Sequence, residues 1–187
     1  RWYVLGESRV REDKITVQRT WLAAQGPTAD GGTASTWAML LAFGAFGNEV
    51  TTEHHVGTEF QADVHWYPGA APLRALVGRL HDEPRLAAAS PVAHTVAEAV
   101  GAAGWAMARE PWLERFPVVV QVAPLPVGNG RWTLADHTGA IPIVPGFWRL
   151  AEVVALSGGR PVVVMGELNA DGILPLTVWA DGGLVLL

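Results

Sequence analysis

Asp136 and His137 are adjacent in the stretch RWTLADHTGAIPIVPGFWRL, and a carboxylate that orients an imidazole is a common acid–base pair. Adjacent residues in a tight turn usually point apart, however, so that neither would orient the other. Asp at the first position and Gly139 at the fourth are typical of a type I turn. We therefore expect this Asp-His-Thr-Gly segment to join two strands and to have no catalytic role.

A second group of chemically capable residues is Glu53, His54 and His55, with His65 on a nearby expected strand. Imidazole and carboxylate groups are ligands for zinc or nickel. The spacing fits no helix face, and in a strand His54 and His55 would point to opposite sides. A solvent-exposed loop is the simpler interpretation, and a His-dependent metalloenzyme is the weakest of the functions that we consider.

Other catalytic groups are scarce. The chain contains no Cys, which excludes thiolate catalysis, disulfides and Cys-based zinc sites within these residues. None of its serines lies in a Gly-x-Ser-x-Gly elbow, and Gly31-Gly32 is not followed by a helix with a Lys, as a phosphate loop requires. We expect a protein that is not an enzyme, with no bound metal and no cofactor.

The nine Trp residues are the most unusual feature of the composition. Trp21, Trp37, Trp132 and Trp179 lie in alternating apolar patterns and are expected in the core. Others flank Pro or Pro-Gly and are expected to be partly exposed, where they could stack on a ligand: Trp66 with Tyr67, Trp112, and Trp148 beside Arg149. The candidate binding residues are Trp66, Tyr67, Arg131, Trp132, Trp148 and Arg149.

Basic residues could form one face of the protein if the N-terminal hairpin packs near the second β-rich region. These residues are Arg9, Arg11, Lys14, Arg19 and Arg131. Arg and Trp on such a face would suit single-stranded nucleic acid. The alternative is ordinary solvated strand edges, which use Lys and Arg to resist aggregation. The formal net charge of −5 argues against non-specific tracking of phosphates.

The elements that would position these groups are mostly strands, because the charged fraction is only 17% while Gly (21 residues) and Pro (13 residues) are frequent. In the first part of the chain the patterns predict a hairpin, a loop, two further strands and a short helix. Their ranges are Trp2–Gly6 with Lys14–Leu22, Ala24–Ser35, Thr36–Phe46, Phe60–Tyr67, and Pro72–Leu80.

The rest of the chain begins with an Ala-rich helix that we expect to start at Ser90-Pro91 and to end at Glu110. Three strands, a helix and a closing hairpin with an edge strand follow, at 116–122, 131–135, 140–144, 147–156, 161–168, 173–179 and 182–187. Five strands with a helix before the fourth is the element order of an OB-type barrel.

The predicted fold is therefore α+β, mainly β, with two β-rich lobes joined by the Ala-rich helix. The expected domains are residues 1–84 (a β-rich lobe with the short helix), 85–114 (the connecting helix) and 115–187 (the OB-like lobe). A weak internal echo, GESRVREDKITVQRTW against GELNADGILPLTVW, leaves open whether the lobes are a duplication. No apolar stretch reaches the roughly 20 residues of a membrane helix, so we expect no membrane partner.

Three segments resemble the C-terminal region of bacterial SWIM zinc-finger proteins. They are ADVHWYPG with the following APLRALVG, then RWTLAD, and the ending WRLAEVVALSGGRPVVVMGELNADGILPLTVWADGGLVLL. In that family the zinc is held by an upstream Cys-x-Cys and Cys-x-His element, and none of those ligands is present in these residues. The resemblance implies an accessory module of a larger cytoplasmic protein, which fits a chain that begins with Arg1 in a strand-like pattern.

Together, these observations predict a non-catalytic interaction module of a SWIM-type protein, which binds a protein partner or an upstream region of its own chain. A single-stranded nucleic-acid-binding module is the alternative. The sequence leaves the identity of the partner and the oligomeric state open.

Overall fold

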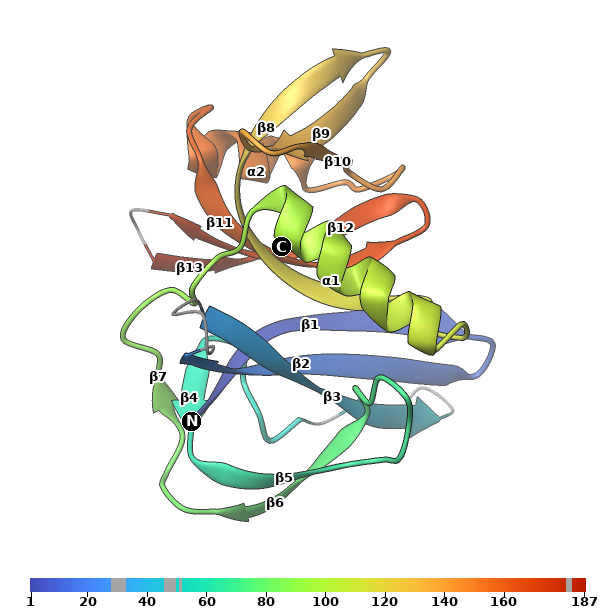
Figure 1. The fold of residues 1–187 in the computed structure, drawn as a ribbon, viewed down its shortest axis with the longest axis vertical. Helices are drawn as coiled ribbons and strands as arrows, with labels where there is room; N and C mark the ends of the chain where they lie inside the picture. Colours follow the sequence, from blue (N-terminus) through green and yellow to red (C-terminus); the bar gives the residue numbers. More distant parts are fainter. Residues whose placement is uncertain (28–32, 46–49, 51, 181–182) are drawn as a thin grey trace. The chain divides into compact units, whose positions relative to one another are not determined.

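The computed structural model describes residues 1–27, 33–45, 50, 52–180 and 183–187. The chain divides into two compact units, unit 1 (Arg1–Pro91) and unit 2 (Val92–Leu187), and each is drawn in Figure 1. In the described residues both units consist mainly of antiparallel strands, and two helices accompany them. The expected class, α+β and mainly β, is confirmed.

Unit 1 is organised around a meander of three long strands. Its sheet has the order β3-β2-β1-β4-β7, and a separate hairpin pairs β5 with β6. The strands are β1 (Trp2–Glu12), β2 (Ile15–Pro27), β3 (Thr33–Ala45), β4 (Thr58–Phe60), β5 (Ala62–Trp66), β6 (Ala75–Leu80) and β7 (Arg85–Leu86).

One core cluster of unit 1 lies on one face of this meander. Val4 of β1 pairs with Leu22 of β2, and Leu22 in turn pairs with Ala38 of β3, so that alternation directs all three side chains the same way. Trp2, Phe60 and Ala75 complete this buried cluster, in which Phe60 is 0% exposed. The side chains of Trp21 and Trp37, which the alternating patterns placed in the core, are also buried but point to the opposite face of the meander.

Unit 2 is a six-stranded antiparallel sheet with the order β10-β9-β8-β11-β12-β13, and helix α1 packs against β8. Its elements are α1 (Val96–Arg109), β8 (Phe116–Gly128), β9 (Arg131–Ala135), β10 (Ala140–Pro142), α2 (Leu150–Ser157), β11 (Val162–Asn169), β12 (Gly172–Ala180) and β13 (Gly183–Leu186). The Ala-rich helix thus belongs to this unit. The expected closed OB-like barrel is not confirmed, because the sheet pairing stays open at β10 and β13.

The helix predicted over Pro72–Leu80 was wrong, because this segment contains strand β6. Ala75 is 1% exposed, Leu76 is 56% exposed and Val77 is half-buried, which is a period of two. Val77 pairs with Val64 across the hairpin. The apolar residues of this short segment fit both periods, and the partner strand decides between them.

Several boundaries also differ from prediction. Strand β1 continues to Glu12 rather than Gly6, and β8 continues to Gly128 rather than residue 122. The expected loop Ala24–Ser35 is partly strand, because β2 and β3 continue their pairing to Pro27 and Thr33. Residues 28–32 of this loop, and Phe46 at the end of the next expected strand, lie outside the described residues. Helix α1 begins after Thr95 rather than Ser90, since Thr95 and Glu98 form a capping box. Helix α2 begins at Leu150, later than expected.

Candidate functional site

Asp136 has a structural role that includes, and goes beyond, the predicted turn. Its Oδ1 accepts hydrogen bonds from the backbone N–H groups of Thr138 (2.7 Å) and Gly139 (3.0 Å). Its Oδ2 accepts from the N–H of Val96 (2.8 Å), so the β9–β10 turn caps the first turn of α1. Desolvation raises the pKa of Asp136, but a hydrogen bond from the Thr138 hydroxyl (2.7 Å) and the three from backbone N–H groups outweigh it and lower the pKa to about 2. The carboxylate is thus occupied, and His137 is exposed.

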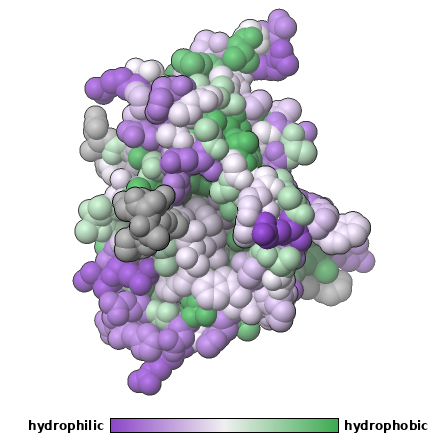
Figure 2. All heavy atoms as spheres, viewed as in Figure 1, coloured by the Kyte–Doolittle hydropathy of each residue, from purple (hydrophilic) through white to green (hydrophobic). Residues whose placement is uncertain are grey.

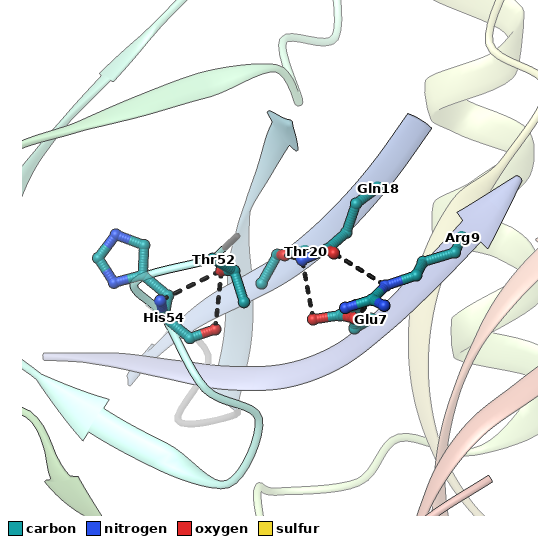
Figure 3. Close-up of polar contacts among 6 residues, drawn as sticks. All are labelled: Glu7, Arg9, Gln18, Thr20, Thr52 and His54. Carbon is teal, nitrogen blue, oxygen red and sulfur yellow. Dashed lines mark hydrogen bonds and ion pairs between the residues drawn. The ribbon is translucent and has the colours of Figure 1, made fainter. Parts of the chain in front are cut away.

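The histidines considered as metal ligands do not converge on one point. The ring of His54 stacks on Phe60 with centroids 5.0 Å apart, and burial lowers its pKa. The backbone N–H of His54 donates to the Thr52 hydroxyl at 3.2 Å, and that hydroxyl donates to the His54 carbonyl (Figure 3). Across the described residues, no three His, Asp or Glu side chains are placed to hold a metal ion.

A polar cluster that the sequence did not reveal lies on β1 and β2 (Figure 3). The register places it on the face that also carries Leu22. Gln18 is 0% exposed; its Nε2 donates to Glu7 at 2.9 Å, and its Oε1 accepts from Arg9 Nε at 2.9 Å. Arg9 also donates to Glu7 at 3.0 Å. The side chains of this cluster provide hydrogen-bond partners for one another, as buried polar groups require. Arg9, a member of the expected basic face, is thereby paired with a carboxylate.

Trp66 and Tyr67 lie at the end of β5 and are partly exposed, at 36% and 42%. The Trp66 indole N–H donates to the Trp37 carbonyl at 2.9 Å, and its ring lies 5.7 Å from that of Trp2. The Arg74 guanidinium lies 4.5 Å from the centre of the Tyr67 ring, which is cation–π geometry. Trp66 therefore helps to hold unit 1 together, and only part of its surface is available to a ligand.

Arg131 and Trp132 are consecutive on β9, and consecutive side chains of a strand point to opposite faces. Trp132 lies on the face that carries the buried Leu134 and is half-buried, whereas Arg131 is exposed. On β8, Leu125 and Val127 are exposed at 47% and 55%. The two candidate residues thus cannot serve one flat surface together.

Trp148 and Arg149 form the more exposed of the two aromatic pairs, and among the expected sites only Trp112 is more exposed, at 91%. The Trp148 side chain is 82% exposed, with the Arg149 guanidinium 5.4 Å from its ring centre. Arg149 is held by two hydrogen bonds to Glu152, one of them from Nε at 2.8 Å, and this interaction lowers the pKa of Glu152. The segment presents a large aromatic surface beside an immobilised guanidinium.

Trp exposure follows the sequence expectation in most cases. Trp21 and Trp37 are buried as expected, Trp132 and Trp179 are half-buried, and Trp112 is 91% exposed. The candidate binding residues form separate local pairs, Trp66 with Tyr67 in unit 1 and Trp148 with Arg149 in unit 2.

Unit 2 also contains two hollows that sequence reasoning missed. One, of about 420 Å³, lies between the end of α2 and strands β8, β11 and β12, with Gln121, Ser157 and Arg160 among its lining residues. The other, of about 470 Å³, lies between α1, β10 and the β11–β12 turn and is mostly apolar. The sequence feature that could have predicted the second hollow is the run of small residues on α1, because small side chains leave space beside the helix.

No model of a known protein family, no curated protein and no solved structure matches this chain. In the described residues, neither helix combines the length and hydropathy of a membrane span.

Proposed function

We propose that this chain is a non-catalytic interaction module built from two OB-like units, and that it binds a protein partner or an upstream region of its own chain. The resemblance to SWIM zinc-finger proteins is part of this proposal, with the chain as an accessory module of such a protein. The observation that carries the proposal is the exposed Trp148 beside the fixed Arg149.

An OB-like barrel in unit 2 is supported by contacts that lie outside the regular strand ladders. The first half of β8 pairs with β11 and its second half with β9, so one strand serves both sides of the sheet. After β10, Ile143 forms an isolated parallel bridge with Ile173 of β12, and the Val144 N–H donates to the Ile173 carbonyl at 3.0 Å. This contact brings the third strand back to the fifth, as a barrel requires.

Unit 1 repeats the same connectivity, which supports an OB-like assignment for it as well. Strand β1 pairs with both β2 and β4, and β5 pairs with β6. Met39 of β3 forms an isolated parallel bridge with Arg74 before β6, and the Met39 N–H donates to the Leu73 carbonyl at 2.6 Å. The internal echo of the sequence compares β1–β2 with β11–β12, which are not equivalent in this connectivity.

Binding of a protein is favoured by the chemistry of the exposed residues. Trp and Arg are the side chains most enriched at interaction hot spots, because they supply large contact areas and directed donors. Trp148 has 82% of its surface exposed, and its neighbour Arg149 is already ordered by Glu152, which reduces the entropy lost on binding. A side chain of this size contributes little to folding when it is so exposed.

Binding of single-stranded nucleic acid is the second candidate. The OB-like connectivity and the exposed Arg131 on β9 favour it. The pairing of the cations weighs against it, since Arg9, Arg115 and Arg149 are each bound to a carboxylate and are not free for phosphates. We therefore rank it below protein binding.

The protein-binding proposal is tested by capture from extracts of the source cells on the immobilised chain, with quantification by mass spectrometry. The wild type is compared with Trp148→Ala and with Leu86→Ala, a matched control at an 81% exposed apolar residue of unit 1. We expect at least one protein that the wild type and the control retain and Trp148→Ala loses. If no captured protein depends on Trp148, the proposal is wrong.

The nucleic-acid alternative is tested by fluorescence anisotropy with labelled oligo(dT) at low salt. Salt-dependent binding that weakens in Arg131→Ala and Trp132→Ala would establish it. An absence of binding at low salt would remove it.

A further inference from the structure

The apolar hollow of unit 2 is a groove with three walls. One wall is the face of α1 that carries Val100, Ala103 and Met107, a second is β10 with Ile141 and Pro142, and the third is the β11–β12 turn. In Figure 2 hydrophobic residues reach the surface in the upper part of the view, in the region where Figure 1 draws α1, β10 and β12. A volume of about 470 Å³ is within the usual range of ligand sites.

The helix wall leaves this space open at a cost in stability. Gly104 lines the groove, and a Cβ built at this position would meet nothing within 4 Å. Gly in a helix interior is less favourable than Ala by about 1 kcal/mol. No close neighbour within the fold requires a Gly here, and the missing side chain leaves the groove open at this point.

The rim of the groove is acidic. Glu114 and Asp171 line it, and in the described part of the chain neither carboxylate has an ion pair. Two cations of the same unit are engaged elsewhere, since Arg115 pairs with the buried Glu167 at 2.8 Å and Arg109 stacks on Trp105 at 3.9 Å. Charge complementarity therefore favours a cationic occupant.

The strand wall determines how the occupant binds. Pro142 has no backbone N–H, so β10 cannot offer a regular ladder to an added strand. Recognition would instead use side chains inserted between α1 and β10, as in the binding of an amphipathic helix to a groove.

We propose that this groove docks a short amphipathic, basic segment of a partner protein. Its apolar side chains insert beside Gly104 and Ile141, and its Lys or Arg residues bind Glu114 and Asp171. The inference rests on the proposed protein-binding function. It adds a second contact surface, whose lining includes neither Trp148 nor Arg149.

The test uses the full chain and a fluorescein-labelled Leu/Lys amphipathic peptide about three helical turns long, with fluorescence anisotropy as the readout. A Leu/Glu peptide of the same pattern is the control probe. We expect saturable binding of the Leu/Lys peptide that weakens as salt increases, and weak or no binding of the Leu/Glu peptide.

Two variants address the groove, each with a matched control. Gly104→Leu fills the groove and should weaken binding about tenfold or more, whereas Gly101→Leu, on the same helix but outside the lining, should not. The double variant Glu114→Gln, Asp171→Asn should weaken binding about tenfold and reduce its salt dependence, whereas Glu53→Gln, Glu83→Gln should not. Since both Gly positions have open space, the Leu variants should fold, which thermal unfolding checks.

Three results would overturn the inference. The first is equal binding to the wild type, Gly104→Leu and the carboxylate variant. The second is equal binding of the Leu/Glu peptide. The third is self-association of the wild type that Gly104→Leu abolishes, because the occupant would then be a second copy of this chain. If cellular capture depends on Trp148 but the Leu/Lys peptide binds the groove variants as tightly as the wild type, this inference fails while the proposed function stands.

Discussion

Gly172→Ala is the substitution that most directly tests how unit 2 returns its third strand to its fifth. Gly172 opens β12 with a φ of +129°, a conformation that L side chains rarely adopt. A Cβ at this position would lie 2.0 Å from the carbonyl oxygen of Pro142, which ends β10. The next residue, Ile173, forms the parallel bridge to Ile143. An added methyl group therefore pushes apart the contact that supports the OB-like proposal.

The cost has two parts. A non-Gly residue held in a sparsely populated backbone region costs about 1–3 kcal/mol. Inserting a methyl group into a closely packed site costs a further 1–3 kcal/mol, roughly, because the backbone must shift. We expect a total loss of about 2–6 kcal/mol. Since 1 kcal/mol corresponds to roughly 4–8 °C for a domain of this size, unit 2 should melt about 8 °C or more below the wild type.

The matched control is Gly158→Ala. Gly158 has a φ of +55° at the C-terminus of α2, but a Cβ there would meet nothing within 4 Å. This variant carries only the backbone term, about 1 kcal/mol. Thermal unfolding by circular dichroism gives the overall loss, and hydrogen exchange of β10 and β12 peptides locates it. If Gly172→Ala loses no more than Gly158→Ala and exchange in β10 is unchanged, the close approach of β12 to Pro142 is wrong.

Three further substitutions have outcomes that follow from the contacts described. The pKa of Asp136 in the folded state, about 2, is below its ordinary 3.8, so the ionised carboxylate stabilises unit 2 above about pH 4. This stabilisation is lost as the pH falls towards 2. In Asp136→Asn, the Tm measured from pH 2 to 5 should therefore depend less on pH than in the wild type. Arg115→Ala removes the cation that pairs with the Glu167 carboxylate (0% exposed) and should lower the free energy of unfolding by urea by about 2–4 kcal/mol. Arg115→Lys should lower it less, because the charge is kept. Equal decreases in the two variants would show that the charge is unimportant. Trp148→Ala should change stability by no more than about 0.5 kcal/mol, whereas Phe60→Ala, in the core of unit 1, should lose about 3–5 kcal/mol in the same assay.

The sequence predicted the local structure well where one physical signal dominated. Alternation found the β1–β2 hairpin and the β11–β12 hairpin, and Asp136 to Gly139 was correctly interpreted as a turn. The same rules failed at Pro72–Leu80, where apolar residues fit two periods and only the pairing of Val64 with Val77 selects a strand. The capping box of Thr95 and Glu98 was readable but was overlooked in favour of Ser90-Pro91.

The site residues were predictable only as candidates. Proximity to Pro indicated that Trp148 would be exposed, and it is. Arg131 and Trp132 were both candidates for one binding surface, but consecutive residues of a strand point to opposite faces of the sheet, and these two are consecutive on β9. The cluster of Glu7, Arg9 and Gln18 depends on the register between β1 and β2, which runs without a shift from Glu7 to the turn at Asp13 and Lys14, whereas the sequence pattern ended the first strand at Gly6.

The contacts that bring strands back across each unit are the hardest to predict, because each is a single parallel bridge between distant residues. Met39 meets Arg74 in unit 1 and Ile143 meets Ile173 in unit 2. The residues share no pattern, and only unit 2 has a Gly at the crossing. What the units share is the condition for such a bridge: a first strand paired on two sides and a fifth strand antiparallel to the fourth. Connectivity of this kind can therefore recur without a recognisable sequence repeat, because the geometry of the strand ends, rather than residue identity, determines it.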